Sequence, residues 1–256
     1  MEMKHNGPRS NGHGEQKKDP ESPPAQNRAL PFPDLAEKMP IAIDGWSQSG
    51  KNTTGALVAE YLGGVLVDSG RFYRAITLAC LNAGVDIFDR EAVTAWCKSA
   101  IIDTRLTQEG ENVEEAQVSV NGQWYSKEAL KNLGLQVSAI SAIPEVREIV
   151  NARLRACQAF GRVVMLGRDI GAKVFHSTPY KFFLDATEEV REQRHLKSTG
   201  SVGAIKRDIY DAHNVLFTES TVMIDTSRLE PAKVSGIILV EVFWLANQLK
   251  DDPFAP

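Results

Sequence analysis

The fold is decided by the stretch Ile41-Ala42-Ile43-Asp44-Gly45-Trp46-Ser47-Gln48-Ser49-Gly50-Lys51. It is a short apolar run that leads into a turn with two glycines and a lysine, and the next residues, 53 to 61, have the mixed apolar and polar pattern of a helix. In a glycine turn between a strand and a helix, backbone N–H groups point inward and cradle phosphate oxygens, and the helix adds its positive end. The stretch therefore predicts a phosphate-binding loop over residues 45 to 53, with Lys51 as its mobile positive charge.

The residue after the lysine is unusual for such a loop. A Ser or Thr commonly stands there as a magnesium ligand, but here Asn52 follows Lys51 and Thr53 comes one position later. The spacing of two glycines and a lysine also occurs by chance, so an ordinary turn with a surface lysine is the alternative. The flanking strand and helix patterns favour the phosphate loop. A Mg²⁺ site near Thr53 is left open.

The rest of the chain repeats the alternation of apolar runs and helices. Further strand-like runs lie at residues 64–68, 162–166, 180–184 and 221–225, and helical stretches at 144–160, 187–197 and 231–249. Nearly continuous apolar strands that alternate with helices are typical of a parallel sheet covered on both faces. We therefore predict an α/β fold, a P-loop protein with a parallel sheet core flanked by helices, in one domain over residues 39–250.

Two segments depart from this alternation. Asn121-Gly122 lies between two strand-like runs, which is a strong hairpin signal, so a small antiparallel insertion is expected at about residues 96–131. Seven of the twelve prolines lie in residues 1–40, among polar residues. Such a segment cannot bury enough apolar surface to fold, and we interpret residues 1–38 as a disordered tail.

Composition limits the partners. The formal net charge is −4 and the pI about 5.8, which gives no general electrostatic reason to bind nucleic acid or an anionic membrane. The three cysteines form no close pair, and the first residues contain no apolar run of the kind that a secretory signal has, so we expect no such signal. We expect a monomeric cytoplasmic protein whose partners are small molecules.

Charged residues follow the other predicted strands. Asp68 and Arg74 come after the second run, and Arg168 and Asp169 after the run at 162–166. Ligands bind at the carboxyl ends of the strands in open α/β sheets, and an arginine fork suits a phosphate. Asp68 could also only cap the following helix.

These motifs together resemble bacterial cytidylate kinases, a branch of the P-loop nucleoside monophosphate kinases. The matching runs are IAIDG with its loop, VDSGRFYRA, VSAISAIPEVR, GRDIGAKVF, KFFLDAT and the RDxxD segment at 207–211. The resemblance covers about Ile41 to Ser227. It implies that the insertion binds the acceptor, that a lid lies at about residues 195–214, and that ATP, with Mg²⁺, gives its γ-phosphoryl group to CMP or dCMP.

The resemblance also implies roles for single residues. The residues that match catalytic positions are Lys51, Arg168 and Arg207. The residues that match acceptor-binding positions are Ser47, Asp68, Ser69, Arg74, Ser138, Arg147, Arg168, Asp169 and Asp211. Within this set, Ser138, Arg147 and Asp169 correspond to residues that read the cytosine ring. The arginine and the aspartate of that set could instead form a solvated ion pair. Arg191 and Arg194 resemble family positions too, although a solvated helix face explains them equally well.

The sequence departs from the family at residues near the phosphates. Trp46 and Gln48 replace a proline and a small residue, Leu166 replaces an aspartate, and Tyr210 and Asn214 stand where further arginines are usual. These changes reduce the number of charged residues that would stabilise the phosphates. The three residues that correspond to the cytosine-reading positions are all present. Two alternatives stay open: a kinase for another small acceptor on the same fold, and a weakly active or inactive nucleotide-binding regulatory relative. The preference between CMP and dCMP is also open.

Overall fold

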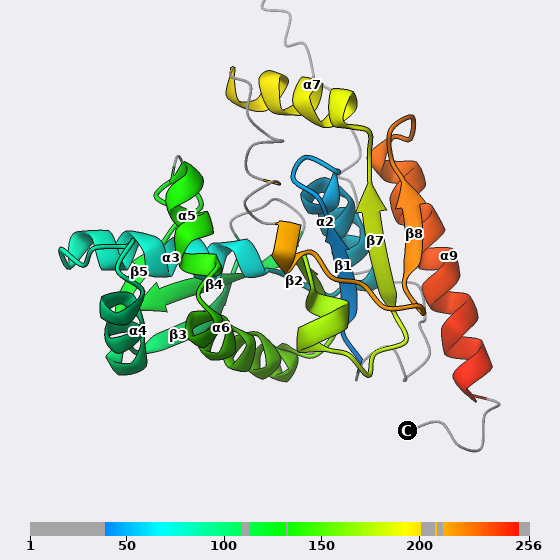
Figure 1. Ribbon diagram of the computed structural model, residues 1–256. Helices are drawn as coiled ribbons and strands as arrows, with labels where there is room; N and C mark the ends of the chain where they lie inside the picture. The colour runs from blue at the N-terminus through cyan, green and yellow to red at the C-terminus, as the bar shows by residue number, and fades with distance from the viewer. Residues whose placement is uncertain (1–38, 109–112, 132, 201–207, 209–211, 251–256) are drawn as a thin grey trace, which may run out of the picture.

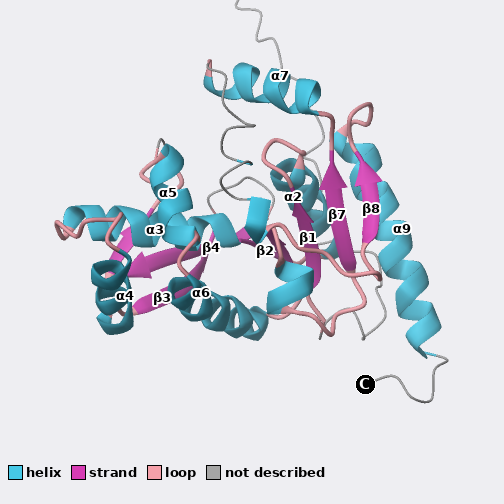
Figure 2. Ribbon diagram, viewed as in Figure 1, coloured by secondary structure: helices cyan, strands magenta, loops and turns pink. Residues whose placement is uncertain are grey.

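The computed structural model describes residues 39–108, 113–131, 133–200, 208 and 212–250, and the predicted tail at 1–38 lies outside them. Five parallel strands form the centre of the sheet in the order β2-β6-β1-β7-β8. Their bounds are β1 (Ile41–Gly45), β2 (Val65–Asp68), β6 (Val163–Gly167), β7 (Lys181–Asp185) and β8 (Val222–Asp225). The predicted α/β fold with a parallel core is confirmed (Figure 1 and Figure 2).

Helices cover both faces of this sheet, and successive side chains along a strand point to opposite faces. Ala42 packs into a core with the helices of one face, whereas Ile41 and Ile43 pack into a core with the helices of the other. The helices are α2 (Lys51–Leu62), α3 (Ser69–Asn82), α4 (Arg90–Ser99), α5 (Gly134–Ser141), α6 (Pro144–Ala156), α7 (Glu188–Thr199) and α9 (Pro231–Lys250). Burial on both faces explains why the strands read as continuous apolar runs.

The predicted hairpin at Asn121-Gly122 is present. It joins β4 (Glu114–Val120) to β5 (Gln123–Tyr125), and β3 (Ile102–Thr107) pairs antiparallel with the other edge of β4. Asn121 has φ 50° and Gly122 has φ 80°, which is the left-handed pair that a type I′ turn needs. β4 also pairs in parallel with β2, so the hairpin extends the central sheet.

The last helix, α9, runs along one flank of the sheet beside β8 (Figure 1). By length and composition alone, its residues Pro231–Leu249 would suffice to cross a membrane, a property that our sequence analysis overlooked. Its inward stripe of Val234, Ile238, Val242 and Ala246 is buried in the core on the α2 face. The opposite side of the helix exposes further apolar residues, such as Val240 and Trp244.

Candidate functional site

The glycine loop between β1 and α2 has the backbone of a phosphate cradle. Gly45 has φ 150°, and a Cβ there would lie 2.2 Å from the Leu184 carbonyl oxygen, so only glycine fits. Gly50 has φ 93° and precedes α2, whose first turn receives no side-chain cap. The N–H groups of that turn therefore lack an internal acceptor and point into the loop. Gln48 also has a positive φ, 60°, which costs energy for a residue with a Cβ.

Lys51 folds back over this loop. Its Nζ donates to the carbonyl oxygens of Gly45 (2.7 Å) and Trp46 (2.5 Å). Part of the side chain stays exposed, but the ammonium group is enclosed. Burial, with a smaller contribution from the positive charge of Arg168, lowers the pKa of Lys51 to about 7, and nearby carboxylates, Asp208 first, oppose that shift. The site thus holds an ammonium group that lacks a sufficient counter-charge.

The end of β2 and the start of α3 supply the second part of the site. The Asp68 carboxylate accepts the Gly70 N–H at 2.9 Å and so caps α3. It also lies 3.5 Å from Arg74 Nη1. The helix-cap interpretation of Asp68 is confirmed, and the contact with Arg74 leaves its role as a site residue compatible with the cap.

The buried carboxylate of Asp44 holds the loop after β6 in place. The two oxygens of Asp44 accept the N–H groups of Ile170 and Gly171, each at 2.9 Å. Burial raises the pKa of Asp44 to about 7, against the lowering effect of these two hydrogen bonds. This contact holds the loop that carries Arg168 and Asp169 against the end of β1.

Arg147 and Asp169 form an ion pair, and neither side chain is solvated: their exposed fractions are 16% and 8%. Arg147 also donates to the Ser141 carbonyl oxygen at 3.3 Å, and its guanidinium lies over the ring of Tyr73 at 5.7 Å. The solvated-pair interpretation is wrong. The pair instead forms one wall of a cavity.

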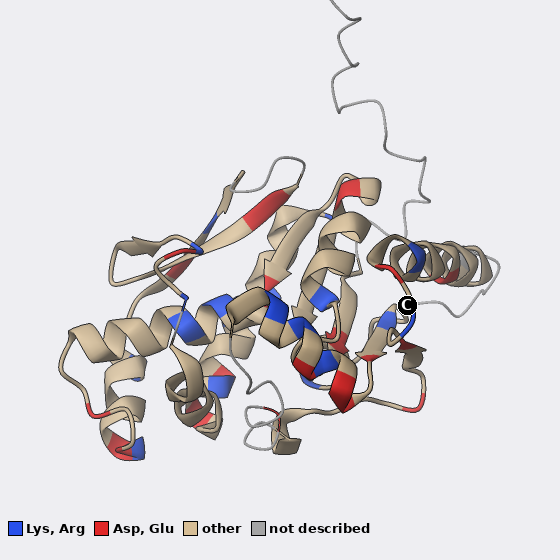
Figure 3. Cartoon of the chain, turned by 90° about the horizontal axis from the view of Figure 1, so that it is seen from above, with Lys and Arg blue, Asp and Glu red and all other residues tan. Residues whose placement is uncertain are grey.

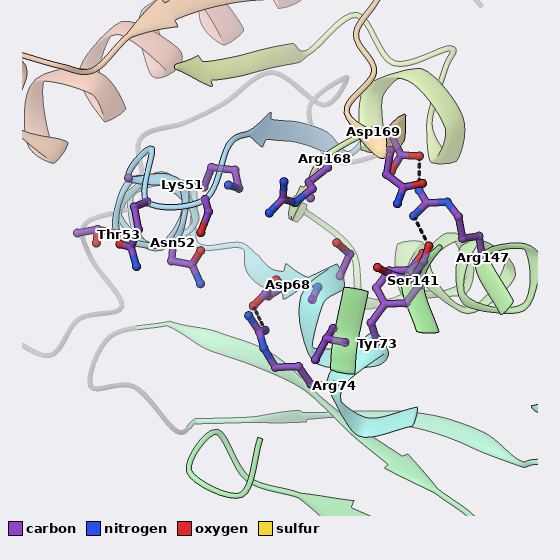
Figure 4. A pocket seen from close by; sticks show the side chains of 18 residues that line it. Lys51, Asn52, Thr53, Asp68, Tyr73, Arg74, Ser141, Arg147, Arg168 and Asp169 are labelled. Carbon is purple, nitrogen blue, oxygen red and sulfur yellow. Dashed lines mark hydrogen bonds and ion pairs between the residues drawn. The ribbon is translucent and has the colours of Figure 1, made fainter. Parts of the chain in front are cut away.

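This cavity has a volume of about 330 Å³ and lies at the carboxyl ends of the strands. Figure 4 shows Lys51, Arg168, Asp68 and Arg74 around one space, with Arg147 and Asp169 at its far side. Viewed from above this edge of the sheet, basic and acidic residues are intermixed on the surrounding elements (Figure 3). The cavity is lined by Ser47, Gln48, Gly50, Lys51, Asn52, Thr53, Asp68, Ser69, Gly70, Tyr73, Arg74, Val137, Ser141, Arg147, Gly167, Arg168, Asp169 and Asn214.

A family model described as cytidylate kinase matches residues 41–242. The chain belongs to the cytidylate kinase family. It is 32% identical to a cytidylate kinase of Bacillus pumilus over 220 residues, which are 80% of this chain and 96% of that protein. It is 33% identical to one of Bacteroides thetaiotaomicron, over 83% and 96% of the two chains, and 40% identical to one of Corynebacterium glutamicum, over 67% and 73%.

The cavity brings together most of the residues that the family resemblance picked out, but not all of them. Gly45, Trp46 and Ser49 belong to the loop without lining the cavity, and Arg207 and Asp211 lie outside the described residues. Ser138 is buried and does not line it either, and its Oγ has no hydrogen-bond partner among the described residues. One helical turn later, Ser141 does line the cavity.

The two unusual loop residues of this cytidylate kinase relative contact α7. The Trp46 ring lies 5.7 Å from the guanidinium of Arg191. Gln48 Nε2 lies 3.2 Å from His195 Nδ1, and the Gln48 carbonyl oxygen accepts from Arg194 at 3.3 Å. Arg191 is 5% exposed and Arg194 is half-buried, so both arginines face the glycine loop and not solvent.

Several site residues were missed by sequence reasoning. Tyr73 stands next to Arg74 in a motif that we had recognised, and Ser141 lies one turn from Ser138, so helical spacing could have flagged both. Asp44 and Asp208 act through partners far along the chain. No local pattern identifies such partners.

Proposed function

We propose that this protein transfers the γ-phosphoryl group of ATP to the phosphate of CMP or dCMP, giving CDP or dCDP. One observation carries the proposal: Lys51, Arg74, Arg168 and the Arg147–Asp169 pair line a single cavity. Two phosphate groups that meet end to end need cationic groups from both sides, and a base needs a separate polar wall. The family membership of the chain supports the same reaction.

On the donor side, the loop amides and Lys51 would hold the β- and γ-phosphates of ATP. The ammonium group would leave the carbonyl oxygens of Gly45 and Trp46 and pair with the phosphates, which supply the charge that the enclosed group lacks. Fixed amides and a lysine stabilise the charge that develops during transfer without reorganising.

On the acceptor side, Arg74 and Arg168 would bind the phosphate of CMP, with Asp68 holding Arg74 in place. The acceptor phosphate is already ionised, so the protein needs no strong general base. Alignment of acceptor and donor supplies much of the rate. Asp169 would accept a hydrogen bond from the exocyclic amine of cytosine, the group that separates cytosine from uracil. Arg147 fixes Asp169, and Ser141 lines the cavity beside this pair, where the family resemblance had pointed to Ser138.

Mg²⁺ would be held mainly by phosphate oxygens and water, as is usual in kinase sites. Thr53 lines the cavity, and a threonine hydroxyl suits one ligand position. No cluster of three or more His, Cys, Asp or Glu side chains that could hold a metal occurs among the described residues. Leu166 packs in the core against Gly55 of α2 and offers no carboxylate. When bound, the ion would screen the charge of the β- and γ-phosphates.

The decisive experiment is a coupled ATP-consumption assay across CMP, dCMP, UMP, AMP and dTMP. We expect the highest kcat/KM with a cytidine nucleotide, and a clear preference for any other acceptor would refute the assignment. Lys51→Ala should abolish turnover with the thermal midpoint unchanged, and Lys98→Ala, at an exposed lysine of α4, is the matched control. Turnover retained in Lys51→Ala would contradict the role of the loop.

The missing charged residues near the phosphates favour a second candidate function, that of a weakly active or inactive nucleotide-binding relative. Leu166 and Asn214 place no charge at two positions that usually carry one in this family. This candidate predicts binding of ATP and CMP by calorimetry with no detectable CDP. The kinase is the better supported of the two, because the base-reading pair and three cationic groups line the cavity.

The domain roles follow from the same proposal. The insertion at about 96–131 would support the acceptor side, and a lid at about 195–214 would exclude water during transfer. Of that lid, residues 201–207 and 209–211 lie outside the described residues. We further propose a monomeric cytoplasmic enzyme whose partners are nucleotides rather than nucleic acid or membrane.

A further inference from the structure

The carboxylate of Asp208 lies beside Ser47 and Arg168, two residues that line the cavity near the glycine loop. Asp208 is 5% exposed. Its Oδ1 accepts the backbone N–H of Ser47 at 3.1 Å and Nη1 of Arg168 at 3.0 Å, and its Oδ2 accepts Nη1 of Arg191. Three donors from three separate elements, the glycine loop, the loop after β6 and helix α7, therefore meet on one anion.

These donors are of the kind that binds a phosphoryl group. A loop amide and two guanidinium groups form short, charge-assisted hydrogen bonds to any oxyanion. Ser47 and Arg168 both line the cavity, and Lys51 beside them feels the negative charge of Asp208. A carboxylate oxygen at this point makes the contacts that an oxygen of the transferred phosphoryl group would make.

Among the described residues, Asp208 places a carboxylate between two guanidinium groups that are mostly buried. Arg191 has an exposed side-chain fraction of 6%, and Arg168 of 17%. Buried guanidinium groups require an anion, and Asp208 supplies a carboxylate to both arginines. A bound triphosphate would bring a second anion to the same donors, and two like charges at hydrogen-bond range of shared donors repel strongly.

We propose that Asp208 sets the phosphate affinity of this site by competing with a bound phosphoryl group for the Ser47 amide and the guanidinium groups of Arg168 and Arg191. The inference rests on the proposed function in that it takes this cavity to be the phosphate site. It adds an affinity-determining residue to which neither the P-loop motif nor the base-reading set points. Its consequence is that the site holds ATP more weakly than its positive charges alone would allow.

The test uses inorganic tripolyphosphate, which has no base or sugar, and ATP as probes in calorimetry on the full chain. Asp208→Asn keeps an oxygen for the Ser47 N–H and removes the charge. We expect this variant to bind both probes at least about tenfold more tightly than the unchanged protein. Asp208→Glu, which keeps the charge, should bind within about twofold of it. Glu145→Gln, at an exposed ion pair with Arg90, is the control for loss of a carboxylate elsewhere.

Equal or weaker binding of tripolyphosphate by Asp208→Asn would overturn the proposal, because a residue that only holds the arginines in place would lower the affinity when changed. Where Asp208→Asn is unfolded by itself, added tripolyphosphate should restore a cooperative thermal transition, since it supplies the missing anion. Failure to restore the transition would equally overturn the proposal. The function is judged separately, by the nucleotide preference of the unchanged protein, so the two ideas can fail independently.

Discussion

Binding of ATP should be accompanied by uptake of a proton at Lys51. The pKa of Lys51 lies at about 7 in the free protein, below its ordinary value of 10.5. At any pH between these two values, Lys51 of the free protein is less protonated than an ordinary lysine. A ligand that restores the ordinary pKa therefore causes Lys51 to take up protons. At pH 8 only about one Lys51 in ten is protonated, so uptake approaches roughly 0.9 proton per ATP.

The assay is calorimetry of ATP binding at pH 8 in buffers that differ in ionisation enthalpy. At this pH the terminal phosphate of ATP is already ionised, since its pKa is about 6. The slope of the apparent binding enthalpy against the buffer enthalpy gives the number of protons. At pH 6 the uptake by Lys51 should fall to roughly 0.1 proton, because most Lys51 is then already charged. The comparison at each pH is the difference between the unchanged protein and Lys51→Met, which cancels protons that belong to ATP itself.

Asp44 is a second group that could take up protons, because its pKa is also raised to about 7. A negative ligand would raise that pKa further and would also cause proton uptake. The two sources are separated by variants: Lys51→Met should lose the uptake at pH 8, and Asp44→Asn should keep it. Full uptake in Lys51→Met, or none in the unchanged protein that binds ATP, would refute the reasoning.

Three further outcomes are expected. Asp169→Asn should lower kcat/KM for CMP about 10- to 100-fold in the coupled assay while UMP falls less, because an amide replaces the charged acceptor that faces the cytosine amine. Asn214→Arg should raise kcat about tenfold or more in the same assay, since it adds a charge to the cavity wall; unchanged turnover would mean that charge at this position is not limiting. Arg71→Met should lower the free energy of unfolding in urea by about 3 kcal/mol, because the buried Glu115 carboxylate loses its buried partner and its other ion pair is with the exposed Lys127. Arg90→Met, at an exposed ion pair, should show no measurable loss.

The parts of the fold that could be predicted are those with local signals. Continuous apolar runs of four or five residues marked the parallel strands, because such strands are buried on both faces. Gly45 and Gly50 marked the loop because their backbone conformations exclude a side chain. Asn121-Gly122 marked the hairpin because Asn and Gly both tolerate the left-handed backbone that its turn requires. In each case the residue type and the local backbone conformation depend on each other.

The parts that could not be predicted depend on distant partners. Gln48 meets His195 across 147 residues, and Arg168 meets Asp208 across 40. A sequence pattern shows that α7 carries arginines, but packing decides that Arg191 turns toward the loop. The same limit applies at Ser138 and Ser141, where one helical turn decides which hydroxyl-bearing residue reaches the cavity wall.

The double pairing of β4 has a consequence for engineering. β4 bonds to β2 and β5 along one edge and to β3 along the other, so residues 102–125 are not a detachable module. Excising them would make β2 an exposed edge strand, whose unpaired amide and carbonyl groups could pair with a second chain. A shortened protein should therefore precipitate before any change in its acceptor preference can be measured.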